Sequence, residues 1–590
     1  MNRNAYPRPQ FQRDEWVCLN GEWTYTLSRK SFCYRNEDIN PRRVNSTGFD
    51  KKINVPFAPE TELSGAMENE LINGIYYHRK LEIPSAWENK KILLHFGAVF
   101  YHAEVYIDGK QAGFHDGGSS SFTVDITGFV KAGAESNLVV KATADLQDGS
   151  IPSGKQSSYI SSYECFYQRT TGIWQSVWME AVSPYALKKV KTVWNESTST
   201  VCFSPEFYSM KRGLKLCVTM RDKNGRSSKA ETAAAEGIPF FISVEKPELW
   251  EPGKPDLYSI EYVLYDGEEE IDRVSSYMGL RTIMVEGNRI FLNGKMLYLR
   301  LVLDQGFYPE GNWTAPGDEA LENDIKLSMA AGFNGARLHQ KVFEERFFYH
   351  ADRLGYLVWA ESPSWGLDYN DMGLPARNFL AEWREIVERD VNHPSIIAWT
   401  PLNETFYFRN AHAHRRLHKE AYDIVKSIDT TRPVNDSSGY IHYITDLWTV
   451  HTYEQDPEKL RKQLEVKDDG PFRNYPAEES EYSGQPYLVD EYGGVKWDPE
   501  TQSDEYLSLS QNLQSWGYGQ APRGSEEYLK RVKELTQAIL SLPHITGYCY
   551  TQLTDVEQEK NGLYFYDRKP KFSPEKYYEI FSRKRDEYDL

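Results

Sequence analysis

The two residues of this sequence best placed to do chemistry are Glu404 and Glu491. Each follows a short apolar segment typical of a buried strand, IIAWTPLN before Glu404 and YLVD before Glu491. A carboxylate at such a place is costly to desolvate unless it is hydrogen-bonded or used in a reaction. About three strand–helix units of roughly 30 residues separate them, which predicts that they face each other across one pocket. Opposed carboxyl groups can hydrolyse a glycosidic bond, where one protonates the leaving oxygen and the other attacks the anomeric carbon or activates water.

These two roles require different pKa values. Burial and a neighbouring carboxylate would keep Glu404 protonated as the general acid, while Glu491 would stay ionised as the nucleophile. The alternative is a structural ion-pair cluster with Arg300 and Arg337, which follow the first two predicted strands of the same region. These arginines could equally position a substrate, so both interpretations stay open at this point.

Further polar residues follow the same strand-like segments. In a barrel of alternating strands and helices, the active site lies at the carboxyl ends of the strands. We therefore expect the following residues near the two glutamates: Glu361 after LVWA, Asn403 before Glu404, His451 and Tyr453 after LWTV, and Asp490 before Glu491.

The histidines do not predict a metal centre. His339, His393 and His451 are far apart in the sequence, and two of them lack an adjacent carboxylate ligand. His393, in VNHPSIIAW, precedes its strand on the side away from the active site and has an expected structural role. No Walker-type or dinucleotide-binding glycine loop is present. We expect neither a metal nor another cofactor.

The elements that must position these residues change in character along the chain. Short runs of alternating apolar and polar residues predict an N-terminal jelly roll over residues 1–186 and an immunoglobulin-like β-sandwich over 187–283. Residues 284–590 alternate apolar strands with amphipathic helices and predict a (β/α)8 TIM barrel. Its strand candidates lie near residues 298, 336, 359, 399, 435, 450, 490 and 548, and its helices include 318–331, 343–354, 376–390, 411–428 and 524–541.

Composition excludes several other classes of protein. The net charge of -18 comes without any long basic run, so a nucleic-acid partner is not expected. No stretch of 18 apolar residues and no apolar signal-peptide core occur, which predicts a soluble, cytoplasmic protein without a membrane partner. The six cysteines form no C-x-x-C pair and are expected as free thiols.

Several motifs resemble those of glycoside hydrolase family 2, which includes β-galactosidases, β-glucuronidases and β-mannosidases. They are GIWQSVW (172–178), NGKMLYLR (293–300), GFNGARLH (332–339), NHPSIIAWTPLNE (392–404) and YLVDEYGG (487–494). The resemblance covers nearly the whole chain and implies a sugar-binding jelly roll, an immunoglobulin-like sandwich and a catalytic barrel. It also implies that Glu404 is the acid/base, that Asn403 touches the sugar 2-hydroxyl, and that Glu491 is the nucleophile of a retaining double displacement.

The sequence departs from the family at positions that concern the sugar. Glucuronidase members carry an Asn-x-Lys pair ahead of DRKPK, whereas Glu559 and Asn561 occupy the matching places here. An aspartate that often reads the sugar 4-hydroxyl is replaced by Phe166, and Asp304 and Gln305 stand where many members have a His-Glu pair. The residues expected to line the sugar site are Asn403, Asp304, Gln305, Arg337, His339, His451, Tyr453, Trp365, Tyr550 and Asn561.

These observations predict a retaining exo-β-glycosidase that removes terminal neutral sugars, similar to a β-galactosidase. β-Glucosidase or arabinosidase specificity is the first alternative, and β-glucuronidase specificity comes third. A carbohydrate-binding protein with an inactive barrel is the alternative from another class. The expected partners are a carbohydrate substrate and a second copy of the chain in a homo-oligomer, with the insertion 454–485 as a lid or subunit contact.

Overall fold

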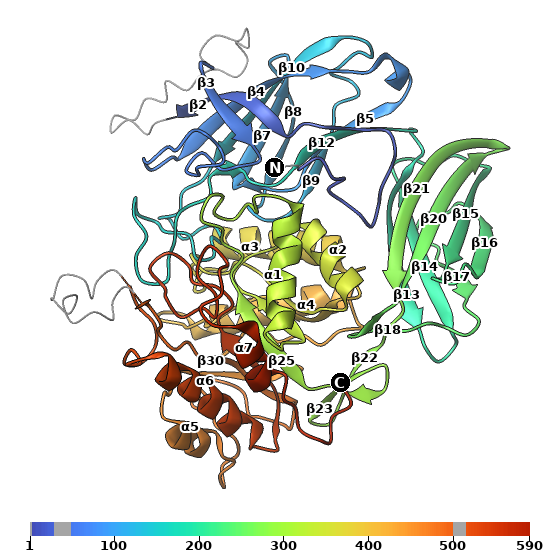
Figure 1. The fold of residues 1–590 in the computed structure, drawn as a ribbon. Coiled ribbons are helices and arrows are strands. Elements are labelled where there is room, and N and C mark those ends of the chain that lie inside the picture. Colours follow the sequence, from blue (N-terminus) through green and yellow to red (C-terminus); the bar gives the residue numbers. More distant parts are fainter. Residues whose placement is uncertain (1–2, 29–48, 500–514) are drawn as a thin grey trace.

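A computed structural model describes residues 3–28, 49–499 and 515–590. Figure 1 shows two β-sandwiches, one of N-terminal strands and one beside it, both packed on a region of alternating strands and helices. The predicted order of jelly roll, immunoglobulin-like sandwich and TIM barrel is therefore confirmed at the level of fold.

The N-terminal sandwich consists of two antiparallel sheets packed face to face. Their orders are β1-β12-β5-β9 and β3-β2-β4-β10-β7-β8. Trp23 and Tyr77 of one sheet and Leu94 and Met179 of the other belong to one buried core. The strands are β1 (Trp16–Cys18), β2 (Gly21–Ser28), β3 (Lys51–Val55), β4 (Gly74–Glu82), β5 (Lys91–Phe96), β7 (His102–Ile107), β8 (Lys110–Asp116), β9 (Phe122–Asp125), β10 (Glu135–Thr143) and β12 (Val177–Val182), with a separate pair β6 (Val99–Phe100) and β11 (Gly172–Ile173).

The second sandwich is smaller and also antiparallel. Along β15, Leu214, Leu216, Val218 and Met220 are buried while the intervening side chains are partly exposed, because alternate residues of a strand face opposite sides of the sheet. Its sheets are β13-β14-β17 and β16-β15-β20-β21. The strands are β13 (Leu187–Asn195), β14 (Thr200–Phe207), β15 (Leu214–Arg221), β16 (Ser227–Ala233), β17 (Phe240–Ser243), β20 (Leu257–Asp266) and β21 (Glu269–Gly279).

The barrel contains a parallel sheet of order β28-β27-β26-β25-β31-β30-β29. A small antiparallel sheet of β22 (Ile283–Glu286), β23 (Arg289–Leu292) and β24 (Lys295–Met296) packs on the apolar core of the parallel sheet. The strands are β25 (Leu299–Asp304), β26 (Gly335–Leu338), β27 (Leu357–Glu361), β28 (Ile396–Thr400), β29 (Trp448–Thr452), β30 (Tyr487–Gly493) and β31 (Ile545–Thr551). The helices are α1 (Asp318–Ala330), α2 (Glu345–Leu354), α3 (Leu374–Asp390), α4 (Ala411–Ile428), α5 (Pro457–Leu464), α6 (Ser525–Leu540) and α7 (Pro574–Phe581).

The strand expected near residue 435 is not a regular strand, which corrects the prediction. The segment makes isolated parallel bridges to the β28 side, Trp399 to Val434 and Asn403 to Ser438. Toward β29 the bonds come from side chains instead, since the Thr449 hydroxyl accepts from the Gly439 N–H at 2.9 Å. The segment closes the barrel between β28 and β29 without a full backbone ladder.

Successive side chains of a strand point to opposite faces of the sheet, and this alternation (the parity of a position) decides which residues of the barrel strands face the pocket. Leu299, Leu301 and Leu303 of β25 fill the interior, together with Trp359 and Cys549. The residues between them, such as Val302 of β25, pack under the surrounding helices. A strand-end residue therefore reaches the pocket only if its parity matches that of the interior residues.

Two further expectations concern the whole chain. Among the helices of residues 3–28, 49–499 and 515–590, none is both long and apolar enough to cross a membrane. Five of the six cysteines are free thiols, Cys18, Cys165, Cys202, Cys217 and Cys549. The sixth, Cys33, lies outside the described residues.

Candidate active site

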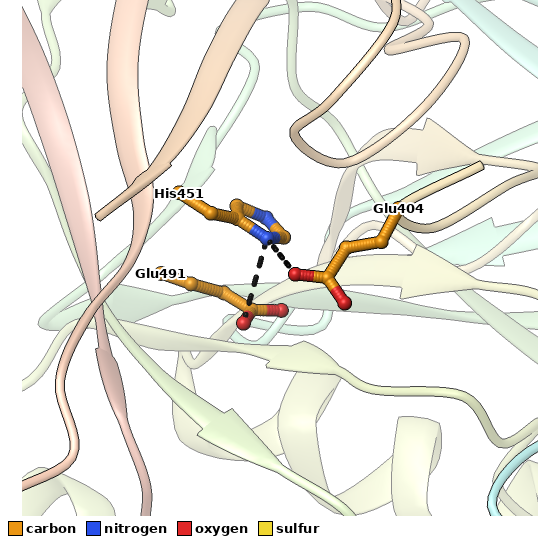
Figure 2. A group of neighbouring side chains, drawn as sticks. All are labelled: Glu404, His451 and Glu491. Atoms are coloured by element: carbon orange, nitrogen blue, oxygen red, sulfur yellow. Dashed lines mark hydrogen bonds and ion pairs between the residues drawn. The ribbon is translucent and has the colours of Figure 1, made fainter. Parts of the chain in front are cut away.

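Glu404, His451 and Glu491 converge at the carboxyl ends of the barrel strands, as Figure 2 shows. His451 Nδ1 lies 2.7 Å from Glu404 Oε1 and 3.5 Å from Glu491 Oε2. One carboxyl oxygen of each glutamate and one His451 ring nitrogen all lie within 4.8 Å of one another. The two glutamates predicted from the sequence thus share one site.

Glu491 reaches this site because β30 is irregular. In a regular strand Asp490 and Glu491 would point to opposite faces. The register of β30 shifts between Val489 and Tyr492 against β31, and that of its pairing with β29 shifts at His451. Such a bulge re-aims side chains next to a functional site. Consequently both Asp490 and Glu491 are buried and contact His451.

Glu404 is held in a strained backbone conformation. Its φ of 46° lies in the left-handed region, which a residue with a side chain adopts only when its surroundings impose it. The Glu404 N–H donates to the Ser438 carbonyl at 3.0 Å, and the Thr405 hydroxyl lies 2.8 Å from His418 Nε2. These contacts fix the direction in which the Glu404 side chain leaves the barrel.

Cations around Glu491 favour its ionised form. Burial alone would raise the pKa of Glu491, but the charges of His451, Arg337 and Lys155 outweigh it and hold the pKa below its ordinary value. Arg337 and the Tyr453 hydroxyl both donate hydrogen bonds to the Glu491 carboxylate. Glu491 is therefore suited to act as an anionic nucleophile near neutral pH.

His451 carries a positive charge over the same range. Burial would lower its pKa, yet Glu491, Asp490 and Glu404 raise the pKa to about 10. Its Nε2 lies 3.3 Å from Asp490 Oδ1 and 3.0 Å from the Ser438 hydroxyl. Glu404, His451 and Glu491 also form a group of donors close enough to hold a metal ion, found among the described residues. The protonated imidazole has no free lone pair, so a metal would have to displace its proton.

Most of the residues expected to line the sugar site lie near Glu404 and Glu491. Arg337 donates to His339 Nδ1 at 2.8 Å, and its other terminal nitrogen lies 3.4 Å from Asn403 Oδ1. The Trp365 indole N–H donates to the Asn403 carbonyl at 3.1 Å. Within the described structure, the buried Nδ2 of Asn403 has no hydrogen-bond partner. That amide is available to a bound ligand beside Glu404.

Asp304 and Tyr550 do not reach the glutamates, which corrects two expectations. Asp304 accepts from the Gly306 N–H at 2.9 Å, and burial together with Asp324 raises its pKa to about 7. The Tyr550 ring packs 5.1 Å from that of Phe581 in α7. The cause is parity, because their neighbours Leu303 and Cys549 point into the barrel. Thr551, next along β31, lies within 3.2 Å of the Tyr453 hydroxyl instead.

Gln305 and Asn561 belong to a second buried cluster, centred on Glu559. Gln305 Nε2 lies 2.6 Å from Gln552 Oε1, and Gln552 donates to Asn561 Oδ1 at 2.7 Å. Asn561 donates in turn to Glu559 Oε1 at 2.9 Å, and the Tyr167 hydroxyl donates to Glu559 Oε2. Tyr167 comes from the N-terminal part of the chain, so this cluster joins the jelly roll to the barrel.

Two residues near the pair were not expected from the sequence. Lys155 is 7% exposed and its ammonium lies 5.3 Å from the centre of the Trp365 ring. Tyr518 stacks on Tyr453 with ring centres 3.4 Å apart. Neither carries a local sequence signal, because each reaches the site through a loop remote from the glutamates in sequence. The insertion 454–485 also contributes Asn474, which accepts from the His451 N–H at 3.1 Å.

Comparison with known families agrees with this arrangement. The family model for the glycosyl hydrolases family 2 sugar binding domain matches residues 17–182, and the TIM barrel domain of the same family matches 283–583. A third model, described as glycosyl hydrolases family 2, matches 188–281. The chain belongs to glycosyl hydrolase family 2.

Individual relatives are more distant. A putative β-glucuronidase of Formosa agariphila is 27% identical over 460 residues, which are 73% of this chain and 52% of that protein. A β-galactosidase of Thermoanaerobacter pseudethanolicus is 24% identical over 503 residues, 81% of this chain and 62% of that protein. The matched part of the chain thus spans less than two thirds of either relative. The solved structure of a β-D-glucuronidase from Dictyoglomus thermophilum is similar in fold, with a TM-score of 0.78, 20% identity, and coverage of 99% of this chain and 100% of that one.

Proposed function

We propose that this chain is a retaining exo-β-glycosidase that hydrolyses terminal neutral sugars, with Glu404 as acid/base and Glu491 as nucleophile. The observation that carries the proposal is the closeness of the two carboxyl groups, one oxygen of each lying within 4.8 Å of the other. Retaining enzymes place their carboxyls about 5 Å apart, whereas inverting enzymes leave roughly 6.5–9.5 Å for a water molecule. The spacing favours direct attack by Glu491.

The reaction has two steps. In the first, Glu491 attacks the anomeric carbon while Glu404 gives its proton to the leaving oxygen, so the glycosidic bond breaks and a glycosyl ester forms. In the second, Glu404 takes a proton from water as the water oxygen attacks the same carbon and releases Glu491. Positively charged His451, 2.7 Å from Glu404, stabilises the carboxylate that remains after the first proton transfer.

Residues from the N-terminal sandwich support an exo mode of action. Lys155 lies over Trp365, and Tyr167 donates to Glu559 in the barrel. An exo mode requires contacts of this kind, in which a second domain closes one side of the sugar site. The same architecture supports our proposed domain boundaries of 1–186, 187–283 and 284–590.

A neutral sugar such as a β-galactoside is favoured by the Glu559 cluster. Glu559 and Asn561 occupy the places where glucuronidase members of the family carry Asn and Lys. Burial raises the pKa of Glu559, while the charge of Lys155 and the hydrogen bond from Asn561 favour its ionised form. A uronate carboxylate beside ionised Glu559 would be repelled. β-Glucoside or arabinoside specificity would fit the same cluster.

β-Glucuronidase activity is the second candidate. It is favoured by the printed name of the Formosa agariphila relative and by the positive charge of Lys155. An inactive carbohydrate-binding barrel remains the alternative from another class. Its weakness is that both glutamates, Asn403 and the cations that hold Glu491 ionised are all in place.

One experiment tests the proposal. The wild type and Glu491→Ala are incubated with p-nitrophenyl β-galactoside, glucoside, glucuronide, mannoside, fucoside, xyloside and arabinosides, and the first sugar released is identified by NMR. We expect one neutral sugar to be released as the β-anomer by the wild type alone. Release of the α-anomer would contradict retention, and a preference for the glucuronide would favour the second candidate.

A further inference from the structure

Lys155 is a buried cation for which the described residues supply no hydrogen bond or ion pair. It is 7% exposed, and within the described residues its ammonium makes no side-chain hydrogen bond and lies within 4.0 Å of no carboxylate oxygen. Its ammonium lies over the face of Trp365, 5.3 Å from the ring centre. Burying an unpaired charge is costly, so this arrangement calls for a ligand that completes it.

The backbone holds Lys155 in this position. The Tyr167 N–H donates to the Lys155 carbonyl at 2.8 Å, while the Tyr167 hydroxyl donates to Glu559. Trp365, beneath the ammonium, donates to the carbonyl of Asn403 next to Glu404. Lys155 is therefore connected to the Glu559 cluster through Tyr167, and to Asn403 through Trp365.

Lys155 remains charged in this setting. Burial would lower its pKa, but Glu559, the Cys165 thiol and Glu491 raise the pKa above the ordinary lysine value. The same charge contributes to the low pKa of His339, whose first cause is burial. Its ammonium offers three N–H donors over Trp365, whose indole donates to the Asn403 carbonyl.

The surrounding charges determine which ligand group suits this ammonium. Glu559 and Glu491 are both close enough to act on Lys155, so one lysine already faces two carboxylates. A ligand carboxylate would bring a third negative charge into the same buried region, which its burial would penalise. A hydroxyl oxygen accepts from the ammonium without adding charge. The negative charges near Lys155 therefore favour a neutral acceptor over a ligand carboxylate.

We propose that Lys155 of the N-terminal sandwich is a substrate-binding residue that donates hydrogen bonds to hydroxyl oxygens of the terminal neutral sugar. The inference rests on the proposed glycosidase function of the Glu404–Glu491 pair and adds a specificity residue from a different domain. The terminal sugar is then held between the barrel, through Asn403, and the jelly roll, through Lys155. A sugar lacking the hydroxyl that Lys155 contacts should be a poor substrate.

The test combines variants of Lys155 with altered sugars. The value of kcat/KM is measured for the wild type, Lys155→Met and Lys155→Gln on the p-nitrophenyl β-glycoside that the wild type cleaves fastest, and on its monodeoxy derivatives. We expect Lys155→Met to lose about 10- to 100-fold on the parent sugar, the range for a hydrogen bond from a charged donor. Lys155→Gln, which keeps a donor but no charge, should lose less.

The deoxy sugars identify the contact. For the derivative that lacks the contacted hydroxyl, the wild type should lose a similar factor and Lys155→Met should lose little more, because the two changes remove one interaction. Equal losses from Lys155→Met on all derivatives would overturn the proposal. So would a wild type that prefers the glucuronide and loses only that activity in Lys155→Met.

Two controls separate this inference from neighbouring causes. Lys560→Met removes a lysine from the adjacent loop whose charge acts on Asp555 and Glu557, and it should leave the deoxy pattern unchanged. Thermal melting of each variant reports whether it is folded. A wild type that cleaves no glycoside would refute the glycosidase function and the inference together, whereas an active wild type with an unaffected Lys155→Met would refute the role of Lys155 alone.

Discussion

His451 Nδ1 lies 2.7 Å from Oε1 of Glu404, so the proposed acid/base is hydrogen-bonded to an imidazole that is itself charged. The same ring approaches Glu491 and Asp490. One cation thereby touches three buried or half-buried carboxyl groups. It links the proton that Glu404 must transfer to the charge that Glu491 must keep.

This linkage predicts a pH-dependent contribution to stability. The pKa of His451 rises from an ordinary 6.5 to about 10, so the folded protein binds this proton more tightly than the unfolded chain. The stabilisation is complete below pH about 6.5 and is lost as the pH rises toward 10. We expect the free energy of unfolding to fall less over this window in His451→Gln than in the wild type. The difference between the two falls should be on the order of 1–3 kcal/mol. Parallel pH curves from urea titrations of the two proteins would refute the charged imidazole.

Tyr453 should tune the nucleophile. Its hydroxyl donates to Glu491 and contributes to the lowered pKa of that carboxyl, after the cations. Removing it in Tyr453→Phe should raise the pKa of Glu491, shift the acidic limb of the kcat/KM profile to higher pH, and lower kcat about 10- to 100-fold. Tyr492→Phe is the matched control, since the Tyr492 hydroxyl is hydrogen-bonded to Thr536 of α6 and not to Glu491. An unshifted acidic limb in Tyr453→Phe would exclude the role.

The Glu559 cluster should control discrimination against acidic sugars. The double variant Glu559→Asn with Asn561→Lys restores the Asn-x-Lys pattern of the family's glucuronidases. We expect the ratio of kcat/KM for the β-glucuronide to that for the neutral sugar to rise at least about tenfold. The reason is that the carboxylate at position 559 is removed and a cation is added at position 561. Asn561→Lys alone is the control, since the new lysine would pair with Glu559. An unchanged ratio in the double variant would mean that Glu559 does not set this preference.

Asp304 should affect stability and not catalysis. Its carboxyl faces away from the glutamates, and burial together with Asp324 raises its pKa from 3.8 to about 7. The folded protein therefore retains a proton that the unfolded chain releases, and stability falls as the pH rises from about 4 to 7. We expect Asp304→Asn to keep kcat/KM within about twofold and to show a smaller loss of stability over that window. A large rise in KM would restore Asp304 as a sugar contact.

The fold could be predicted because its strands and helices carry strong periodic patterns, as in the alternating β15 and the helix near 411–428. Glu404 and Glu491 could be recognised because each follows a run of mostly apolar residues. Parity was harder. Asp304 and Tyr550 each lie one residue from a position that faces the interior, and only the packed barrel decides which side each takes. The bulge in β30 that turns both Asp490 and Glu491 inward has no marker in the local sequence.

Contacts between domains were beyond sequence patterns altogether. Lys155 and Tyr167 belong to a loop of the N-terminal sandwich, and their place over Trp365 and Glu559 depends on how two domains pack. The strand predicted near residue 435 was wrong for a related reason. A side chain of β29 accepts the hydrogen bond that the backbone of a neighbouring strand would normally accept.

The most direct test of the account is to trap the glycosyl ester on the enzyme. The wild type is treated with the 2,4-dinitrophenyl 2-deoxy-2-fluoro derivative of the sugar that it cleaves fastest, and the digested protein is analysed by mass spectrometry. We predict one added fluorosugar, on the peptide containing Glu491, and none in Glu491→Ala. A sugar attached to any other residue, or none in an enzyme that turns over the parent glycoside, would contradict the assignment of Glu491 as the nucleophile.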